Sequence, residues 1–477
     1  MTIYGMKRIA DPVHGTIGLS GLEIEFISTG AFQRLRNIKQ LGLSHLVFPG
    51  SDYSRLSHSI GVCHVTGRIL EALQPCNGGT VTEEEHQQYR LAGLLHDVGH
   101  YPFSHAFESA VTDHYDNKTR SGFFGVPNNP ANNANQLTDP EYRALDHEVV
   151  GQLLLQRDPE LCSVLAKHGI SSDEIFSIFS REQPPRFSNL ISSDLDADRI
   201  DYLMRTALHT GLPYGTVDVD YLLTQMSLDA KNRICLTPKA LRTAEHFLLG
   251  RFFDYRQVSY HTTVAAFEQI LKEVIDELLV RDHLDCSQSG IENMIETGSW
   301  HGFDDPELLR LIRRLGDSVD DDDVLTRKID SLLKRIPPKL IGAIEFIDDR
   351  HNSDIHDQNV RKLRRLSQIL ADKFNIDPRL WFVWESNSGT FTKVGPHAPV
   401  SVSPPDDDDL EQSIRVLYGE VSKPIFTVAN SLMKILAQTA LYASRLYVVF
   451  PEGREAERDD VTKAARCYVD DVNWVDG

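Results

Sequence analysis

One short run near residue 95 limits what this chain can be more than any other stretch does. The leucines of residues 91–95 fit one buried helical face, and the pair His96-Asp97 follows them directly. Gly99 follows Asp97 by two residues, and we expect it to end the helix with a positive φ. An imidazole and a carboxylate then stand together on a rigid backbone, which suits a divalent metal ion. Taken alone, such a pair is more often a core histidine beside a capping aspartate, so other segments must decide.

The length, charge and cysteine content restrict the class of protein. With 477 residues, 41% of them hydrophobic and 25% charged, the chain has the composition of a globular protein and room for two to four domains. A net charge of −20 disfavours a role in coating nucleic acid or a membrane surface, although a local basic pocket could still bind an anion. The six cysteines lack metal-finger spacing. Because no signal segment or membrane-spanning run is visible, we expect a cytoplasmic protein.

Hydrophobic periodicity predicts a mainly α fold. We expect a helical core over 1–290, followed over 291–477 by a helical connector and a smaller α+β region. A polar segment over 112–145 is typical of a loop. The expected helices cover about 29–40, 55–73 with Ser57 as the expected N-cap, 84–98, 147–155, 161–168, 172–180 and 238–280. The expected strands cover about 7–15, as a short strand or turn, 234–236, 380–384 and 446–450.

Four side chains from three separated segments form a candidate metal-ligand set. They are His58, His96, Asp97 and Asp198, each at or near an expected helix end. Two neutral imidazoles and two carboxylates suit Mg, Mn, Fe or Zn and leave positions open for water and a substrate oxygen. A divalent ion lowers the pKa of a water bound to it, so that hydroxide is available as a nucleophile near neutral pH. The same ion can also bind a phosphoryl oxygen. The set therefore predicts chemistry on phosphate esters.

Further side chains near this set fit the same chemistry. His100 and His105 follow the pair closely and His147 lies on a later helix, and histidine is the usual group for protonating a leaving oxygen near neutral pH. A lone histidine is nevertheless more often structural, and an exposed arginine is more often a solvated surface charge. The arginines that could bind a polyphosphate are Arg55, Arg199 and Arg251.

The order of these residues resembles that of the HD-domain phosphohydrolases, whose H…HD…D pattern matches His58, His96-Asp97 and Asp198. Over about residues 5–270 the chain looks like the deoxynucleoside-triphosphate triphosphohydrolases, which include the mammalian SAM-and-HD-domain enzyme and bacterial relatives. We expect no SAM domain before this core. The motifs that carry the resemblance are Asp11-Pro12-Val13-His14-Gly15, residues 32–42, Val47-Phe48-Pro49-Gly50, residues 55–62, residues 96–105 and residues 196–202.

The resemblance implies a role for each of these residues. Water would attack the α-phosphorus of a deoxynucleoside triphosphate and release a deoxynucleoside and inorganic triphosphate. The implied metal ligands are His58, His96, Asp97 and Asp198. The implied catalytic residues are His105 as general acid, with His100, Glu108 and His147 around the nucleophilic water or a second ion. The implied phosphate ligands are Arg55, Arg199, Tyr202 and Arg251, and Gln40, Leu41 and Tyr260 would contact the sugar.

Two positions depart from the family pattern. Thr206 stands where the mammalian enzyme has an aspartate that contacts the sugar, and Ser28 stands where nucleotide-activated members have an aspartate that binds guanine. Lys7 and Arg36 match the phosphate side of that allosteric site, which therefore takes a different nucleotide or is absent. Relatives are often dimers or tetramers, so the resemblance implies a homo-oligomer.

Three functions remain open at this point. The first is hydrolysis of deoxynucleoside triphosphates. The second is HD-domain hydrolysis of another substrate, either a monophosphate, a modified nucleotide or single-stranded nucleic acid, and Thr206 motivates it. The third is a nucleotide-binding regulator or scaffold that uses the acidic C-terminal region to bind partners or to assemble.

Overall fold

The structure is a computed structural model in which the chain forms two compact units. The helical unit comprises Met1–Ser192, Asp196–Gly211 and Leu271–Leu315, and the mixed unit comprises Ser193–Leu195, Leu212–Ile270 and Gly316–Gly477. The domain boundary predicted at residue 290 rests on a change from helical to mixed α+β sequence patterns, and it stays a prediction. The structure describes every residue except 1–6, 77, 122–143, 179–186, 188–189, 192, 320–321, 350–353, 387–388, 393–411, 470–473 and 477.

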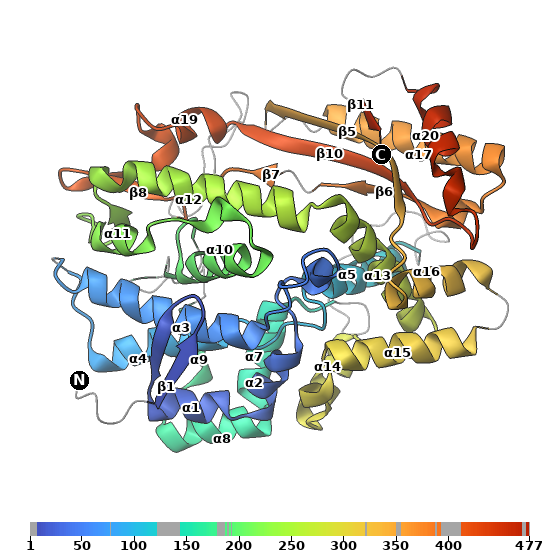
Figure 1. The fold of residues 1–477 in the computed structure, drawn as a ribbon. Coiled ribbons are helices and arrows are strands. Elements are labelled where there is room, and N and C mark those ends of the chain that lie inside the picture. The colour runs from blue at the N-terminus through green and yellow to red at the C-terminus, as the bar shows by residue number, and fades with distance from the viewer. Residues whose placement is uncertain are drawn as a thin grey trace, which may run out of the picture. The chain divides into compact units, whose positions relative to one another are not determined.

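The helical unit starts with an antiparallel hairpin and continues as helices (Figure 1). Strand β1 (Lys7–Asp11) pairs with β2 (Gly15–Leu19), with Lys7 opposite Leu19 and Asp11 opposite Gly15. Its helices are α1 (Gly21–Ile27), α2 (Gly30–Arg34), η1 (Leu35–Asn37), η2 (Gly42–Leu46), α3 (Arg55–Leu73), α4 (Glu83–Leu95), α5 (His105–Ser121), α7 (His147–Arg157), α8 (Pro159–His168), α9 (Ser172–Ser177), α10 (Ala197–Thr210), α14 (Gln288–Glu296), η8 (Ser299–Gly302) and most of α15 (Asp305–Ser318).

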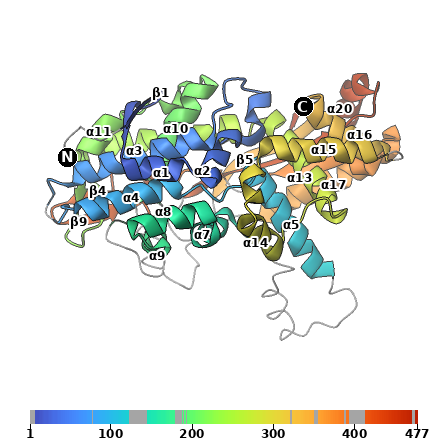
Figure 2. The ribbon, with the colours of Figure 1, turned by 90° about the horizontal axis from the view of Figure 1, so that it is seen from below.

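Helix α3 packs against both α4 and α10 (Figures 1 and 2). Most of its side chains are buried, and Gly61 allows α10 to come close, because a Cβ at that position would lie 1.9 Å from Oδ1 of Asp201. Our predicted N-cap, Ser57, is wrong. The helix begins at Arg55 because the backbone of Ser54 is extended, and the Ser57 hydroxyl donates a hydrogen bond to the Ser54 carbonyl.

The end of α4 brings together the residues from which the sequence interpretation began. The helix starts at a capping box formed by Thr82 and Glu85 and ends with His96 as its C-cap, short of the predicted residue 98. The positive φ predicted for Gly99 is wrong, since this residue is not among the glycines with positive φ. Gly99 instead permits close packing, because a Cβ there would lie 2.2 Å from the carbonyl oxygen of His147.

Three other predicted elements differ in extent. The predicted helix 29–40 stops early, because Arg55 N–H donates to the Ile38 carbonyl and Gln40 N–H to the Tyr53 carbonyl, which holds this segment extended. Helix α5 continues into the predicted loop 112–145, whose residues 122–143 lie outside the described part. The predicted helix 238–280 is two helices, because a π-helical turn interrupts it: α12 (Leu241–Asp254), the turn η7 (Tyr255–Ser259) and α13 (Thr262–Val280).

The mixed unit contains two sheets with helices around them. One sheet has the order β11-β5-β10-β6, with β7 also paired to β10, and the other has the order β3-β4-β8-β9. The strands predicted at 234–236 and 380–384 are present as β4 and β6, and residues 446–448 end β10. The strands β2, β3, β5, β7, β8, β9 and β11 were not predicted. The strands are β3 (Met226–Leu228), β4 (Ile234–Leu236), β5 (Lys339–Asp349), β6 (Trp381–Glu385), β7 (Gly389–Thr390), β8 (Arg415–Tyr418), β9 (Val421–Pro424), β10 (Thr439–Val448) and β11 (Trp474–Asp476). The remaining helices are η5 (Pro213–Gly215), α11 (Val219–Thr224), η6 (Pro238–Ala240), α16 (Asp323–Leu333), α17 (Asp354–Phe374), η9 (Pro378–Leu380), η10 (Ile425–Thr427), α19 (Met433–Leu436), η11 (Glu455–Glu457) and α20 (Arg458–Arg466).

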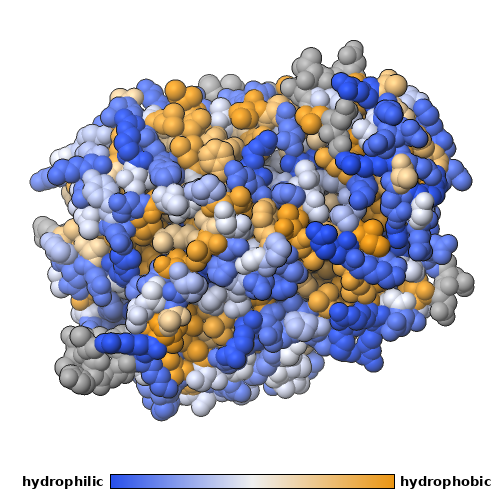
Figure 3. Space-filling model, in the orientation of Figure 1, coloured by the Kyte–Doolittle hydropathy of each residue, from blue (hydrophilic) through white to orange (hydrophobic). Residues whose placement is uncertain are grey.

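The predicted fold class is confirmed: the protein is mainly α-helical, with its sheets concentrated in the C-terminal region. Among the described residues, none of the helices combines the length and apolar character that crossing a bilayer requires. The face drawn in Figure 3 mixes hydrophilic residues with smaller groups of hydrophobic ones.

Candidate active site

Three of the proposed metal ligands lie together in the helical unit. His58 is in the first turn of α3, His96 caps the end of α4, and Asp198 is in the first turn of α10. Oδ1 of Asp198 lies 3.0 Å from Nε2 of His58 and 3.8 Å from Nε2 of His96. One ligand atom from each residue lies within 4.8 Å of the others, so the three could hold one ion.

The hydrogen bonds of the two imidazoles leave their Nε2 atoms available. Nδ1 of His58 lies 2.7 Å from Oδ2 of Asp201, and Nδ1 of His96 lies 2.8 Å from the Gly93 carbonyl oxygen. Each Nδ1 therefore carries a proton and donates it, so that in the neutral ring Nε2 keeps the lone pair that a metal ion would bind. Both Nε2 atoms are buried and have no hydrogen-bond partner among the described residues. A divalent ion would satisfy both nitrogens, so the donor set fits such an ion.

The carboxylates around His58 favour positive charge at its ring. Burial lowers the pKa of His58, but the nearby carboxylates of Asp198 and Asp201 outweigh burial and raise this pKa to about 9. A proton and a metal ion therefore compete for the same nitrogen, and binding of the ion releases the proton.

Asp97 connects this group to its surroundings. Its Oδ2 accepts a hydrogen bond from Nη1 of Arg55 at 2.5 Å, and its Oδ1 lies 3.3 Å from Nε2 of His96 and 3.2 Å from Nε2 of His100. Burial raises the pKa of Asp97, but Arg55, His96 and His100 outweigh it and hold this pKa well below its usual range. Asp97 is therefore an ionised carboxylate in contact with a metal-ligand candidate on one side and with His100 on the other.

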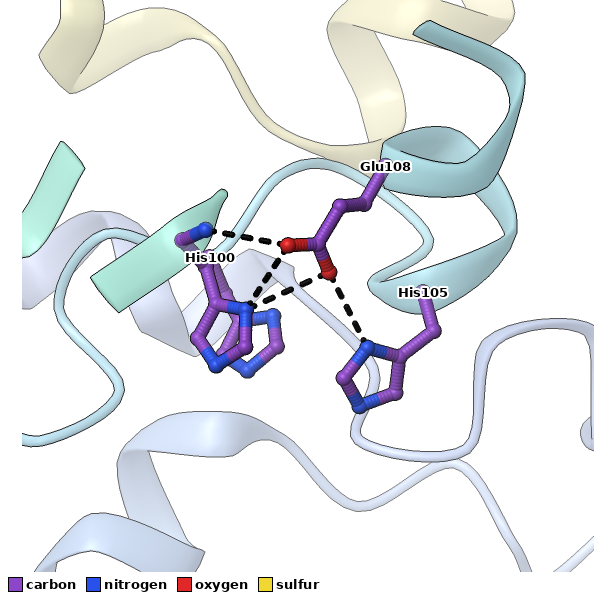
Figure 4. A group of neighbouring side chains, drawn as sticks. His100, His105 and Glu108 are labelled. Atoms are coloured by element: carbon purple, nitrogen blue, oxygen red, sulfur yellow. Dashed lines mark hydrogen bonds and ion pairs between the residues drawn. The ribbon is translucent and has the colours of Figure 1, made fainter. Parts of the chain in front are cut away.

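A second cluster is formed by His100, His105, Glu108 and His147. In Figure 4 the carboxylate of Glu108 points towards the space between His100 and His105. Oε2 of Glu108 lies 3.1 Å from Nδ1 of His105, and Oε1 lies 3.0 Å from Nδ1 of His147. The rings of His100 and His147 are stacked at 3.8 Å. The predicted catalytic residues therefore lie together, next to Asp97.

The charges within this second cluster are paired. Burial raises the pKa of Glu108, but hydrogen bonds and charge from His105 and His147 hold it below its usual range. Burial lowers the pKa of His147, but Glu108 raises it overall. Burial, Arg55 and His147 hold the pKa of His100 well below its usual range, so that its ring is neutral. The cluster thus contains a carboxylate, a neutral imidazole and a more basic one.

A strained turn connects the first cluster, formed by the metal-ligand candidates His58, His96 and Asp198 with Asp97, to the second cluster. Phe103 and Ser104 have φ values of 52° and 58°, which residues other than glycine rarely adopt. The hydroxyl of Ser104 accepts a hydrogen bond from Nε of Arg55 at 2.8 Å, and the Phe103 N–H donates to Oδ1 of Asp305 at 2.7 Å. The turn sets the start of α5, and His105 is the first residue of that helix.

The predicted phosphate and sugar contacts of the helical unit have different surroundings. Arg55 is buried, and protein groups already bind its guanidinium. Arg199 and Tyr202 are half-buried on α10, and Tyr202 shares a helical face with Asp198. Gln40 and Leu41 are also half-buried, and Oε1 of Gln40 has no hydrogen-bond partner among the described residues. Their proposed contacts with a nucleotide stay predictions.

Arg251 and Tyr260 belong to the mixed unit. Nη1 of Arg251 binds Oδ1 of Asp194 at 2.9 Å, and Nη2 donates to the Phe391 carbonyl at 3.1 Å. The ring of Tyr260 lies edge-on to Trp384, with ring centroids 5.4 Å apart. Their proposed roles in binding phosphate and sugar stay predictions.

The structure adds a functional residue that was not predicted from the sequence. Asp201 is fully buried and hydrogen-bonded to His58, and it follows Asp198 by one helical turn. That spacing was visible in the sequence, since residues three apart share a helical face. Its partner could not be read from the spacing, because the approach of α3 to α10 determines it.

Residues 55–203 match the model of a protein family described as "HD domain". This chain contains an HD domain. The match includes the predicted ligands and the second cluster, and it confirms the resemblance predicted from the motifs.

The HD domain of this chain has relatives with and without a named activity. An uncharacterized protein of Methanocaldococcus jannaschii is 29% identical over 283 residues, which is 59% of this chain and 51% of the relative. A Dictyostelium discoideum protein named deoxynucleoside triphosphate triphosphohydrolase SAMHD1 homolog is 28% identical over 81% of this chain and 73% of the relative. The chain spans about half the length of several curated relatives it matches.

A solved structure shares the fold. The crystal structure of a phosphohydrolase from Bacteroides thetaiotaomicron superimposes with a TM-score of 0.67 at 21% sequence identity. The match covers 93% of this chain and 99% of that one. The likeness therefore extends beyond the HD domain to nearly the whole fold.

Proposed function

We propose that this HD-domain protein is a metal-dependent phosphohydrolase that converts deoxynucleoside triphosphates to deoxynucleosides and inorganic triphosphate. One observation carries the proposal: the two buried Nε2 atoms of His58 and His96 face the carboxylate of Asp198, directly beside a His/Glu cluster. Metal ligands next to proton-transfer groups are what hydrolysis of a phosphate ester requires.

In this proposal His58, His96 and Asp198 hold a divalent ion, with Asp97 completing the set. When bound, Mg, Mn, Fe or Zn would supply Lewis-acid chemistry at the α-phosphorus. Asp97 stays ionised beside Arg55, so that its carboxylate can bind the ion.

His105 is the proposed general acid. Its side chain is 72% exposed, and Glu108 accepts the hydrogen bond from Nδ1, so Nε2 remains to donate to the leaving oxygen of the sugar. On the other side of Glu108, Oε1 is hydrogen-bonded to Nδ1 of His147, and the ring of His100 stacks on that of His147. Arg199 and Tyr202, beside Asp198 on α10, are the proposed contacts for the phosphates.

A product assay tests the proposal. Each common deoxynucleoside triphosphate is incubated with the full chain and Mg²⁺ or Mn²⁺, with and without other nucleotides as activators. We expect deoxynucleoside and inorganic triphosphate, and we expect Asp198→Asn to remove the activity. Absence of turnover for every substrate, or release of orthophosphate or pyrophosphate instead, would contradict the proposal.

A second candidate substrate class is favoured by Thr206. This residue is fully buried, and its hydroxyl is hydrogen-bonded to the Tyr53 hydroxyl at 2.8 Å, at the position where the resemblance implies a sugar-binding aspartate. A different sugar or a monophosphate would then be accepted. Faster cleavage of ribonucleotides, monophosphates or single-stranded oligonucleotides in the same assay would favour this alternative.

Three further properties stay proposals. We propose a homo-oligomer and a cytoplasmic location, and an activating nucleotide near Lys7 and Arg36, both of which are exposed. Nη2 of Arg36 already donates a hydrogen bond to the Gln33 side chain, which a bound phosphate would have to replace. Measuring molecular mass with and without added nucleotide tests the assembly, and activation that persists in Arg36→Ala would contradict the nucleotide site.

A further inference from the structure

A buried ionic network lies behind His58, on the side away from Asp198. Its centre is Asp201, which is fully buried on α10. Oδ2 of Asp201 accepts from Nδ1 of His58 at 2.7 Å and from Nε of Arg205 at 2.9 Å. Oδ1 accepts from Nη2 of Arg205 at 2.7 Å and lies 2.6 Å from Nε2 of His14. One carboxylate thus joins the metal-ligand candidate to a histidine of the N-terminal hairpin.

The hairpin itself is fixed by a second carboxylate. Oδ1 of Asp11 accepts the backbone N–H groups of Val13 and His14, both at 2.9 Å, and so shapes the turn between β1 and β2. Oδ2 of Asp11 accepts from Nη1 of Arg205 at 2.9 Å. Arg205 therefore bridges Asp11 and Asp201, and the turn presents the His14 side chain, which is 2% exposed, to Asp201.

Close helix packing makes this network possible. A Cβ at Gly61 would lie 1.9 Å from Oδ1 of Asp201 and 2.5 Å from Nη2 of Arg205, so only glycine leaves room for these groups beside α3. A carboxylate buried in this way depends on every donor around it, because each lost hydrogen bond leaves charge uncompensated.

We propose that His14 is a positioning residue of the metal centre. By holding Oδ1 of Asp201, His14 fixes the carboxylate whose other oxygen, Oδ2, orients the His58 ring, and Nε2 of His58 then faces His96 and Asp198. Groups that hydrogen-bond the ligands of a metal typically change metal affinity about 10- to 100-fold when removed. The inference rests on the proposed metal site and extends it to the hairpin, which precedes the matched residues 55–203.

Binding of Co²⁺ to the full-length chain tests this inference, with affinity measured by competition against a chelator and geometry by the visible absorption of the bound ion. His58→Ala identifies the signal that belongs to this site. His14→Met keeps a side chain of similar length but removes the donor, and we expect about 10- to 100-fold weaker Co²⁺ binding and an altered spectrum. His14→Gln restores a donor and should recover affinity to within about threefold of wild type.

A matched control separates positioning from general damage. The ring of His64 lies 5.4 Å from that of His14. His64→Met should bind Co²⁺ as wild type does. Circular dichroism shows whether each variant is folded. If His14→Met is not folded, Asp11→Asn tests the same network through Arg205 and the turn, and we expect its Co²⁺ affinity to fall by about threefold or more.

The outcomes distinguish this inference from the proposed function. If folded His14→Met, or folded Asp11→Asn in its place, binds Co²⁺ with wild-type affinity and spectrum, the positioning role is wrong and the proposed function stands. If wild type shows no Co²⁺ signal that His58→Ala removes, the metal site fails, and the positioning role fails with it.

Discussion

His105 differs from the other histidines of the two clusters in its exposure. Its side chain is 72% exposed, whereas those of His58, His96, His100 and His147 are between 0% and 21% exposed. A proton donor must reach the substrate, which the exposure of His105 allows. A metal ligand must be held in place, which the burial of His58 and His96 achieves. At the scale of single residues, burial therefore separates the proposed acid from the proposed ligands.

Replacing His105 tests this separation. We expect His105→Asn to lower kcat by about 10²- to 10⁴-fold, because it removes the proton donor, and to leave Co²⁺ binding unchanged. His168→Asn is the control, since His168 also pairs with a glutamate, Glu25, but lies outside both clusters. Equal loss of metal binding and activity in His105→Asn would contradict the assignment.

A second residue-scale prediction concerns Asp254 in the mixed unit. Burial raises the pKa of Asp254 to about 7, even though the Tyr214 hydroxyl donates to Oδ1 at 2.6 Å. Its ordinary pKa is 3.8, so between about pH 4 and pH 7 the folded protein binds more protons at this group than the unfolded chain does. The contribution of Asp254 to stability therefore falls as the pH rises through this range.

Asp254→Asn removes this titration and keeps an acceptor for Tyr214. At pH 8 we expect the variant to be more stable than wild type, by at most roughly 4 kcal/mol. Near pH 4 the two proteins should be nearly equal. Urea unfolding at both values of pH measures the difference, and an identical pH dependence in both proteins would show that Asp254 is not the buried acid described.

At the scale of elements, the turn between α4 and α5 depends on a segment outside the matched HD-domain residues. The carboxylate of Asp305, at the start of α15, accepts the N–H groups of Phe103 at 2.7 Å and Lys39 at 3.0 Å. Arg34 donates to the carbonyls of His100 and Phe303 and stacks on Trp300. These contacts offset the strain of the positive φ at Phe103 and so hold α5 in place.

Asp305→Ala should expose the cost of that strain. The variant leaves the buried N–H of Phe103 and the partly buried N–H of Lys39 without their acceptor, and we expect a loss of about 1–3 kcal/mol in unfolding free energy. Activity should fall further than stability alone explains, because His105 starts α5. Glu307→Ala, which removes an exposed ion pair on the same helix, should change stability by less than about 0.5 kcal/mol. Similar effects for both variants would contradict the bracing role.

These elements also show what the sequence could and could not predict. Apolar periodicity placed α3 and α4 and brought His58, His96 and Asp198 to helix ends. Helix limits were less accurate, because Ser54 and Ser57 are equally good caps in sequence and only the extended backbone of Ser54 decides between them. Contacts such as those of Asp201 and Asp305 depend on how distant segments pack, and local sequence does not encode their partners.

At the scale of the whole molecule, the two units interleave along the chain. The helical unit contains the two clusters, and it is completed by Asp196–Gly211 and Leu271–Leu315, which return to it from the mixed unit. Two of the predicted substrate contacts, Arg251 and Tyr260, belong to the mixed unit.

The most direct measurement follows the oxygen that enters during hydrolysis. The full chain is incubated with a deoxynucleoside triphosphate and Mn²⁺ in water enriched in the heavy oxygen isotope, and the masses of the products are measured by mass spectrometry. Attack at the α-phosphorus predicts one heavy oxygen in inorganic triphosphate and none in the deoxynucleoside. Heavy oxygen in orthophosphate or in the deoxynucleoside, or no hydrolysis at all, would contradict the account.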